Sequence, residues 1–96
     1  MFKDLDPILH SQLRLQIVSL LMQVESASFN YLLETTGATK GNISTQINKL
    51  KDAEYISVSK EFKDNYPLTT CRITQKGKKA FEEYVKALQS YIGPKV

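Results

Sequence analysis

The sequence predicts a mainly α-helical fold with one β-hairpin, in the order helix, helix, helix, strand, strand, helix (α-α-α-β-β-α). The chain has 96 residues, which is enough for one core and too few for two. Apolar residues recur at helical spacing in the first half and again near the end, and two stretches between these regions alternate with a period of two. We therefore expect residues 1–96 to form a single domain.

The first helix is expected to begin at Asp6, which suits an N-cap, with Pro7 at the first helical position, where a backbone N–H is not needed. Ser11 could cap a second helical piece, so a break near His10 is the alternative. The run that follows is too apolar for one buried stripe and carries two apolar faces at helical spacing. The first face is Leu13, Ile17, Leu20, Leu21 and Val24, and the second is Leu15, Val18 and Met22.

Two further helices are expected in the middle of the chain. After a turn at Glu25–Ser28, the stretch FNYLLETTG predicts a short helix that ends at Gly37. Thr39 is the expected N-cap of a third helix, which runs to about Ala53. Only the tripeptide Gly-Ala-Thr separates these helices, a spacing typical of a helix-turn-helix.

A hairpin and a last helix complete the order. EYISVSKEF and LTTCRIT both alternate like half-buried strands, and KDNYP between them reads as the hairpin tip. Thr74 caps a final helix that Gly93-Pro94 ends. The apolar stripe of that helix is Phe81, Tyr84, Val85, Leu88 and Ile92. A hairpin placed after a helix-turn-helix is a wing, so the predicted fold is a winged helix-turn-helix.

The third helix has an unusual polar face. Ile43, Ile47 and Leu50 fall within roughly 60° of one another and form its packed seam. The opposite face carries Gly41, Thr45 and Asn48, flanked by Asn42, Ser44 and Lys49. Long Glu and Lys side chains would be better helix formers on a face that is merely solvated. Amide, hydroxyl and ammonium groups can instead bond to bases and phosphates, so this face predicts entry into a DNA major groove.

Charge is distributed unevenly along the chain. Residues 39–80 hold nine basic residues against four acidic ones, whereas the rest holds four against six. This bias predicts a positive surface for a polyanion, and an ordinary solvated surface is the alternative. Lys60, Lys63 and Arg72 lie on or beside the hairpin, where they could contact phosphates or the minor groove; protection of a strand edge is the alternative there.

The stretches TKGNISTQINKLKDAEYISVSKEF and ITQKGKKAFEEYVKAL resemble the small single-domain group of MarR-related winged-helix transcriptional regulators. The resemblance covers the chain from about Asp6 to Tyr91. It implies a dimeric DNA-binding regulator with its wing at Phe62–Pro67 and dimer contacts on the first and last helices. The third helix would then contact the major groove through Thr39, Lys40, Gly41, Asn42, Ser44, Thr45, Gln46, Asn48 and Lys49.

One position departs from the family pattern. The family usually has glycine in a left-handed conformation after the recognition helix, within an AGY pattern, where this chain reads Ala53-Glu54-Tyr55. A residue other than glycine costs on the order of 1 kcal/mol if that conformation is kept. We therefore expect the helix to end differently here and the aim of the wing to shift slightly.

The excess of apolar residues also predicts a homodimer, because a thin domain cannot bury all of them on its own. Ordinary core packing is the alternative. The expected interface residues are Leu15, Val18 and Met22 on the first helix and Tyr84, Leu88, Tyr91 and Ile92 on the last.

No residue pattern indicates an enzyme, a metal site or a cofactor. His10 has no nucleophile arranged around it, and one histidine with one cysteine cannot build a zinc site. Cys71 is expected to be a small buried hydrophobe; the alternative is a redox switch in which Arg72 favours the thiolate. No apolar run is long enough for a membrane helix, and a cytoplasmic setting is expected.

The partners expected are double-stranded DNA and a second copy of the chain, and the family also allows a small-molecule effector. The alternative function is a winged-helix module that docks on another protein through the polar helix and does not bind DNA. Such modules usually carry acids or apolar residues on that face, where this chain has only Asp52.

Overall fold

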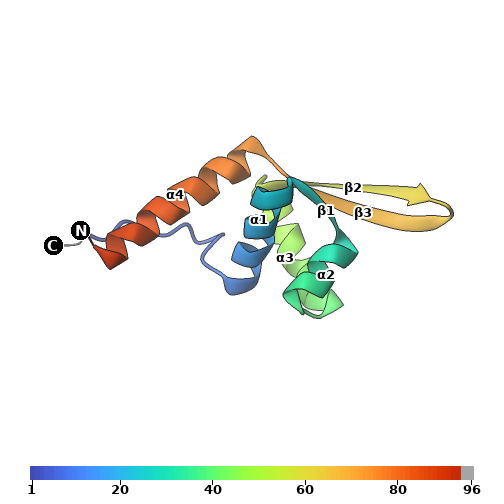
Figure 1. Ribbon diagram of the computed structural model, residues 1–96, viewed down its shortest axis with the longest axis horizontal. Coiled ribbons are helices and arrows are strands. Elements are labelled where there is room, and N and C mark those ends of the chain that lie inside the picture. The colour runs from blue at the N-terminus through green and yellow to red at the C-terminus, as the bar shows by residue number, and fades with distance from the viewer. Residues whose placement is uncertain (94–96) are drawn as a thin grey trace.

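The computed structural model describes residues 1–93 and confirms the winged-helix architecture. Figure 1 shows α1, α2 and α3 gathered at the root of a long hairpin, with α4 leaving on the opposite side. The molecule is therefore elongated, with extents of 58 × 25 × 21 Å. Its elements are α1 (Gln12–Val24), β1 (Ser26–Ser28), α2 (Phe29–Thr36), α3 (Lys40–Asp52), β2 (Ile56–Lys63), β3 (Tyr66–Ile73) and α4 (Gln75–Ile92).

The core lies where α1 meets α2, α3 and the root of the sheet. Each helix turns its branched apolar residues inward, as the helical spacing of those residues predicts. Strands β2 and β3 contribute their alternate, inward side chains. The fully buried residues are Leu9, Ile17, Val18, Leu21, Leu32, Ile43, Leu50 and Cys71, and Ile47, Ile56, Ile73, Tyr84 and Ala87 are nearly so.

Two predicted dimer contacts need correction. Val18 is fully buried within one chain, and Tyr84 is only 5% exposed, so a second copy would have almost nothing left to cover at either residue. Both belong to the core instead. Tyr84 also places its hydroxyl 3.1 Å from Nδ1 of His10, a residue at the surface.

The N-terminal segment differs from the predicted helix start. Asp6 caps a single turn only: its carboxylate accepts from the N–H of Ile8 at 2.8 Å, and its carbonyl accepts from the N–H of His10 at 2.8 Å. Ser11 is then extended, and α1 begins at Gln12. The predicted start at Asp6 is therefore wrong, and the alternative of a break near His10 is confirmed.

The sheet has one strand that the sequence did not predict. β1 pairs antiparallel with β3, placing Ala27 opposite Cys71, in a three-stranded sheet of order β1-β3-β2. The turn predicted at Glu25–Ser28 is thus wrong for its last three residues. A strand of three residues is too short to show an alternating pattern, and its pairing with the distant strand β3 defines it.

The helix ends follow the local sequence signals. Gly37 ends α2 in the left-handed conformation (φ 71°). The hydroxyl of Thr39 accepts from the N–H of Asn42 at 3.2 Å. The hydroxyl of Thr74 accepts from that of Gly77 at 2.9 Å, so both predicted N-caps are confirmed. α4 ends before Gly93 as predicted, and Pro94 of the predicted stop lies outside the described residues.

The wing is a tight two-residue hairpin. Asp64 and Asn65 both have positive φ (52° and 65°), as in the mirror-image turns that match the twist of paired strands. The strands therefore extend further than the predicted tip allowed, with Lys63 opposite Tyr66. The next pair, Phe62 and Pro67, falls at a non-hydrogen-bonded position, where the missing N–H of proline costs no ladder bond.

Candidate nucleic-acid interface

Helix α3 presents its predicted polar face to solvent. Its apolar seam of Ile43, Ile47 and Leu50 is buried against the core. Every polar side chain of the helix except Gln46 is exposed, so short donors and acceptors cover the outward surface between cations at both ends. The predicted DNA-contact residues that are exposed here are Thr39, Lys40, Gly41, Asn42, Ser44, Thr45, Asn48 and Lys49.

Gln46 is tied to α1 rather than free. Its Oε1 accepts from Nη1 of Arg14 at 2.5 Å, and its Nε2 donates to Oδ1 of Asn42 at 3.0 Å. Arg14 is itself anchored, because its Nε donates to the carbonyl of Ile8 at 2.6 Å. The chain Arg14–Gln46–Asn42 therefore orients the start of the polar face.

Arg14 was missed by the sequence reasoning. The available signal was a lone arginine inside an otherwise apolar helical run, which indicates a buried or half-buried donor with a specific partner. Its partner could not be identified, since Gln46 lies 32 residues away.

The two faces of the hairpin carry different residues. Because side chains alternate along a strand, Ile56, Val58, Lys60 and Phe62 share one face of β2, and their β3 partners share the same face of the sheet. We call this the inner face, since Val58, Lys60 and Thr69 line a hollow together with residues of α2 and α3. The residues contributed by those helices are Phe29, Ser44, Ile47 and Asn48.

Of the three basic residues predicted to contact DNA from the hairpin, only Lys60 lies on the inner face, next to α3. Lys60 and Thr69 of the wing line the hollow together with Ser44 and Asn48 of α3, so four donor-bearing side chains surround it. Lys63 and Arg72 alternate onto the opposite, outer face of the sheet and are exposed. The structure thus separates these two residues from the polar face of α3.

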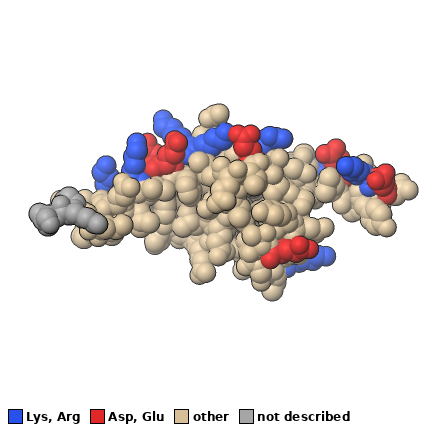
Figure 2. Space-filling view, in the orientation of Figure 1, with Lys and Arg blue, Asp and Glu red and all other residues tan. Residues whose placement is uncertain are grey.

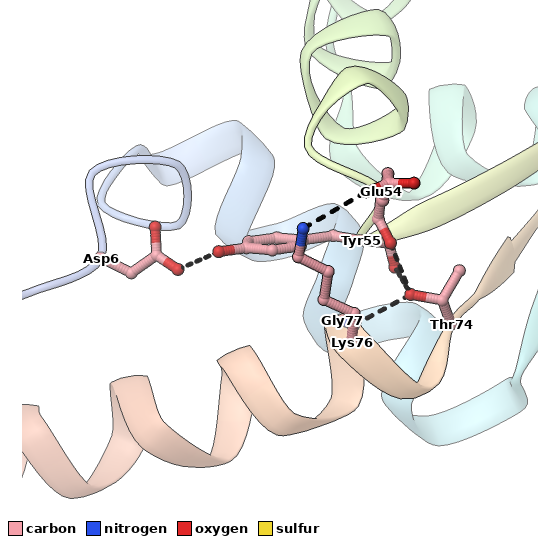
Figure 3. Close-up of polar contacts among 6 residues, drawn as sticks. All are labelled: Asp6, Glu54, Tyr55, Thr74, Lys76 and Gly77. Carbon is pink, nitrogen blue, oxygen red and sulfur yellow. Dashed lines mark hydrogen bonds and ion pairs between the residues drawn. The ribbon is translucent and has the colours of Figure 1, made fainter.

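The joint between α3 and the wing keeps the left-handed conformation without glycine. Glu54 has φ 65°, and its side chain pairs with Nζ of Lys76 at 3.5 Å. The hydroxyl of Thr74 donates to the carbonyl oxygen of Glu54 at 2.7 Å and lies 3.0 Å from the carbonyl oxygen of Tyr55 (Figure 3). The expectation that α3 ends differently here is therefore wrong. The N–H of Tyr55 donates to the carbonyl of Leu50 at 3.0 Å, as at a left-handed helix end, and contacts from the start of α4 add to this bond. One of these, the exposed ion pair, is worth little.

Tyr55 links this joint to the N-terminal segment. Its hydroxyl donates to Oδ2 of Asp6 at 2.5 Å (Figure 3). Burial, and then the hydrogen bond to Asp6, raise the pKa of Tyr55 to about 12, so the phenol stays protonated even near pH 10, where an ordinary tyrosine ionises. Gly77 packs directly beneath, because a Cβ there would lie 2.1 Å from the carbonyl oxygen of Tyr55.

Cys71 does not have the surroundings of a redox thiol. It is fully buried in β3, and burial raises the pKa of its thiol to about 11. Arg72 lies on the other face of the strand, so the predicted alternative of an arginine-activated thiolate is wrong. Within residues 1–93, no cluster of three or more His, Cys, Asp or Glu side chains could hold a metal ion, and no helix is both long and apolar enough to cross a membrane.

The surface also carries an uncharged region. Figure 2 shows charged side chains along the α4 edge, at the wing tip and at the lower edge, while the middle of this face, over α1, is almost free of them. Leu88, Tyr91 and Ile92 near the end of α4 are 41%, 47% and 78% exposed. Phe2 stacks on Tyr91 with ring centroids 4.8 Å apart and is itself 70% exposed.

Comparisons with known proteins agree with this geometry. A family model described as a winged helix DNA-binding domain matches residues 13–92. An uncharacterized protein of Methanocaldococcus jannaschii is 33% identical over 78 residues, which cover 81% of this chain and 85% of that protein. A transcriptional regulator homologue from Pyrococcus horikoshii superposes with a TM-score of 0.83 at 26% identity, covering 88% of this chain and 84% of that one.

A second solved structure extends the likeness in fold. The transcriptional regulator BldR from Sulfolobus solfataricus gives a TM-score of 0.72 at 23% identity, covering 85% of this chain and 58% of that one. The matched family is described as a DNA-binding domain, and both solved structures are described as transcriptional regulators or their homologues.

Proposed function

Because this chain belongs to the winged helix DNA-binding domain family, we propose that it is a MarR-related, sequence-specific regulator of transcription that binds double-stranded DNA as a homodimer. Helix α3 enters the major groove, and the wing lies on the backbone or the minor groove. One observation carries the proposal. The apolar residues of α3 face the core, and its exposed residues are short donors and acceptors between cations.

The exposed side chains of α3 divide into two roles. Asn48 and Thr45 lie opposite the buried seam, where they meet base edges if the helix lies in the groove. Lys40 and Lys49, near the two ends of the helix, meet phosphates, which position the protein without reading sequence. Lys60 stands across the hollow from Asn48, so the DNA strand that passes between helix and wing meets donors on both sides.

The homodimer is proposed from the exposed apolar residues. Leu88, Tyr91 and Ile92 are at least 41% exposed near the end of α4, and Leu15 and Met22 on α1 are half-buried. The uncharged middle of the face in Figure 2 suits contact with a second copy. A two-fold dimer would place two α3 helices about 34 Å apart, which is one turn of DNA.

Selection of binding sites from random duplex DNA tests the proposal as a whole. We expect an enriched site with dyad symmetry, bound with an affinity that falls steeply as salt rises. Asn48→Ala and Thr45→Ala should each lose about 1–3 kcal/mol of discrimination at one base pair of each half-site. Gln89→Ala, an exposed polar substitution on α4, is the matched control and should retain the full preference.

Other outcomes would separate the proposal from its alternative. A chain that binds no duplex at low salt would favour a protein-docking module. An enriched site without dyad symmetry would refute the homodimer and leave DNA binding intact. Sequence preference that survives both α3 substitutions would show that other side chains read the bases.

A further inference from the structure

The wing carries two large aromatic side chains that the core does not use. Phe62 is 80% exposed and Tyr66 is 75% exposed, each within two residues of the turn. An aromatic side chain can bury roughly 150–250 Å² when it finds a partner, so leaving both in solvent forgoes a large contribution to stability. For Phe62, which lies on the inner face of the hairpin, this exposure points to a partner outside the chain.

The two aromatics lie on opposite faces of the hairpin. Phe62 follows Ile56, Val58 and Lys60 on the inner face, and its cross-strand neighbour on that face is Pro67. Tyr66 pairs with Lys63 on the outer face. Phe62 and Pro67 form a non-hydrogen-bonded pair, in which the Cβ atoms lie about 4.5–5.5 Å apart, so the two rings form one apolar surface.

The inner face of the wing adjoins the polar face of α3, and no acidic residue of β2 lies on it. The hollow between α3 and the wing is lined by Ser44, Asn48 and Lys60, and Phe62 is the next inward residue along β2. Glu61 of the same strand alternates onto the outer face. The inner face of the wing thus combines one cation with an apolar tip, which fits a polyanion that also offers apolar surface.

We propose that Phe62 and Pro67 form an apolar wedge that enters the DNA minor groove next to the major groove occupied by α3. The proposal rests on the proposed function. Phe62 lies two strand residues, or about 7 Å, beyond Lys60 along β2. With Lys60 at the phosphates between the two grooves, the side chain of Phe62 lies at the minor groove, which is about 6 Å wide. Phenylalanine and proline are among the side chains with which minor-groove proteins unstack base steps and bend the duplex.

The test compares substitutions on the two faces of the wing. Phe62→Ala and Tyr66→Ala are both made at exposed positions, and thermal unfolding establishes that each variant remains folded. Duplex affinity is measured by fluorescence anisotropy at several salt concentrations, using the site found by selection. DNA bending is measured in parallel by energy transfer between dyes at the two ends of that duplex.

The wedge predicts a specific pattern. Phe62→Ala should weaken binding about tenfold at every salt concentration, because an apolar contact releases no counterions, and it should reduce the energy transfer caused by binding. Lys60→Ala should weaken binding and also lower the salt slope by about one. Tyr66→Ala should change neither the affinity nor the bend.

Three results would overturn the inference. Wild-type affinity and bending in Phe62→Ala would refute the wedge while leaving duplex binding in place. Equal losses in Phe62→Ala and Tyr66→Ala would refute the choice of the inner face. Absence of duplex binding by the wild-type chain would remove the proposed function and the wedge together.

Discussion

Replacing Gly77 with alanine should destabilise the joint between α3 and α4. A Cβ at this position would lie 2.1 Å from the carbonyl oxygen of Tyr55 and 3.0 Å from Cδ1 of Ile73. The carbonyl oxygen of Tyr55 is a backbone atom that already accepts from the N–H of Thr74 at 3.1 Å. It also lies 3.0 Å from the hydroxyl of Thr74. The added methyl group can therefore be accommodated only by moving a hydrogen-bonded turn.

The magnitude follows from these contacts. Overpacking costs about 1–3 kcal/mol. Weakening two hydrogen bonds costs about 0.5–1.5 kcal/mol each. The gain in helix propensity from glycine to alanine returns about 1 kcal/mol. We expect a net loss of about 1–5 kcal/mol in the free energy of unfolding, and a Tm lower by roughly 5–25 °C.

The assay is urea and thermal unfolding followed by circular dichroism at fixed protein concentration. Gly41→Ala is the matched control, because that glycine is also helical and a Cβ there meets nothing within 4 Å. We expect the control to be as stable as the wild type or slightly more so. If Gly77→Ala had the same urea midpoint and Tm as Gly41→Ala, the close approach of α4 to the carbonyl of Tyr55 would be refuted.

Three other substitutions or titrations test the same region and the core. Glu54→Gly should raise the free energy of unfolding by up to about 1 kcal/mol, because the gain at positive φ exceeds the lost exposed ion pair with Lys76; lower stability in urea would contradict this. The neutral phenol of Tyr55 should stabilise the fold fully below pH 10, with that contribution lost as the pH rises through its pKa of about 12. Urea midpoints of wild type and Tyr55→Phe should therefore differ most below pH 10. The thiol of Cys71 should react with a thiol reagent at neutral pH only in urea, because it is buried and its pKa is raised to about 11; fast reaction of the native chain would contradict its burial.

Some structural features followed from local residues alone. The N-caps at Thr39 and Thr74 and the left-handed Gly37 depend on contacts within a few residues, so the sequence predicted them correctly. The seam and polar face of α3 followed in the same way, because helical periodicity determines which side chains share a face. Most of the exposed residues of the candidate interface on α3 could therefore be predicted from the sequence.

Other features depended on residues far apart in the chain. The strand β1 exists because β3 pairs with it, and the carbonyl of the left-handed Glu54 accepts a hydrogen bond from Thr74 just before α4. Arg14 reached Gln46 across 32 residues, and no pattern near either residue indicated the bond. These contacts depend on how the elements pack, which local propensity does not determine.

The division between sequence and tertiary structure is clearest at the wing. The alternating pattern predicted the two strands, but it placed Lys63 in the hairpin tip and could not say which face of the hairpin lies toward α3. The fold decided this, because the buried Ile56 and Cys71 draw one face of the sheet toward the core and α3. The sequence by itself thus determined a winged helix whose third helix has a polar outward face, since periodicity and capping are local. Only tertiary packing decided that the face of the hairpin with Lys60 and Phe62 lies toward α3, and that Lys63 and Arg72 lie on the opposite face. The reason is that a sheet orients so as to bury its apolar face.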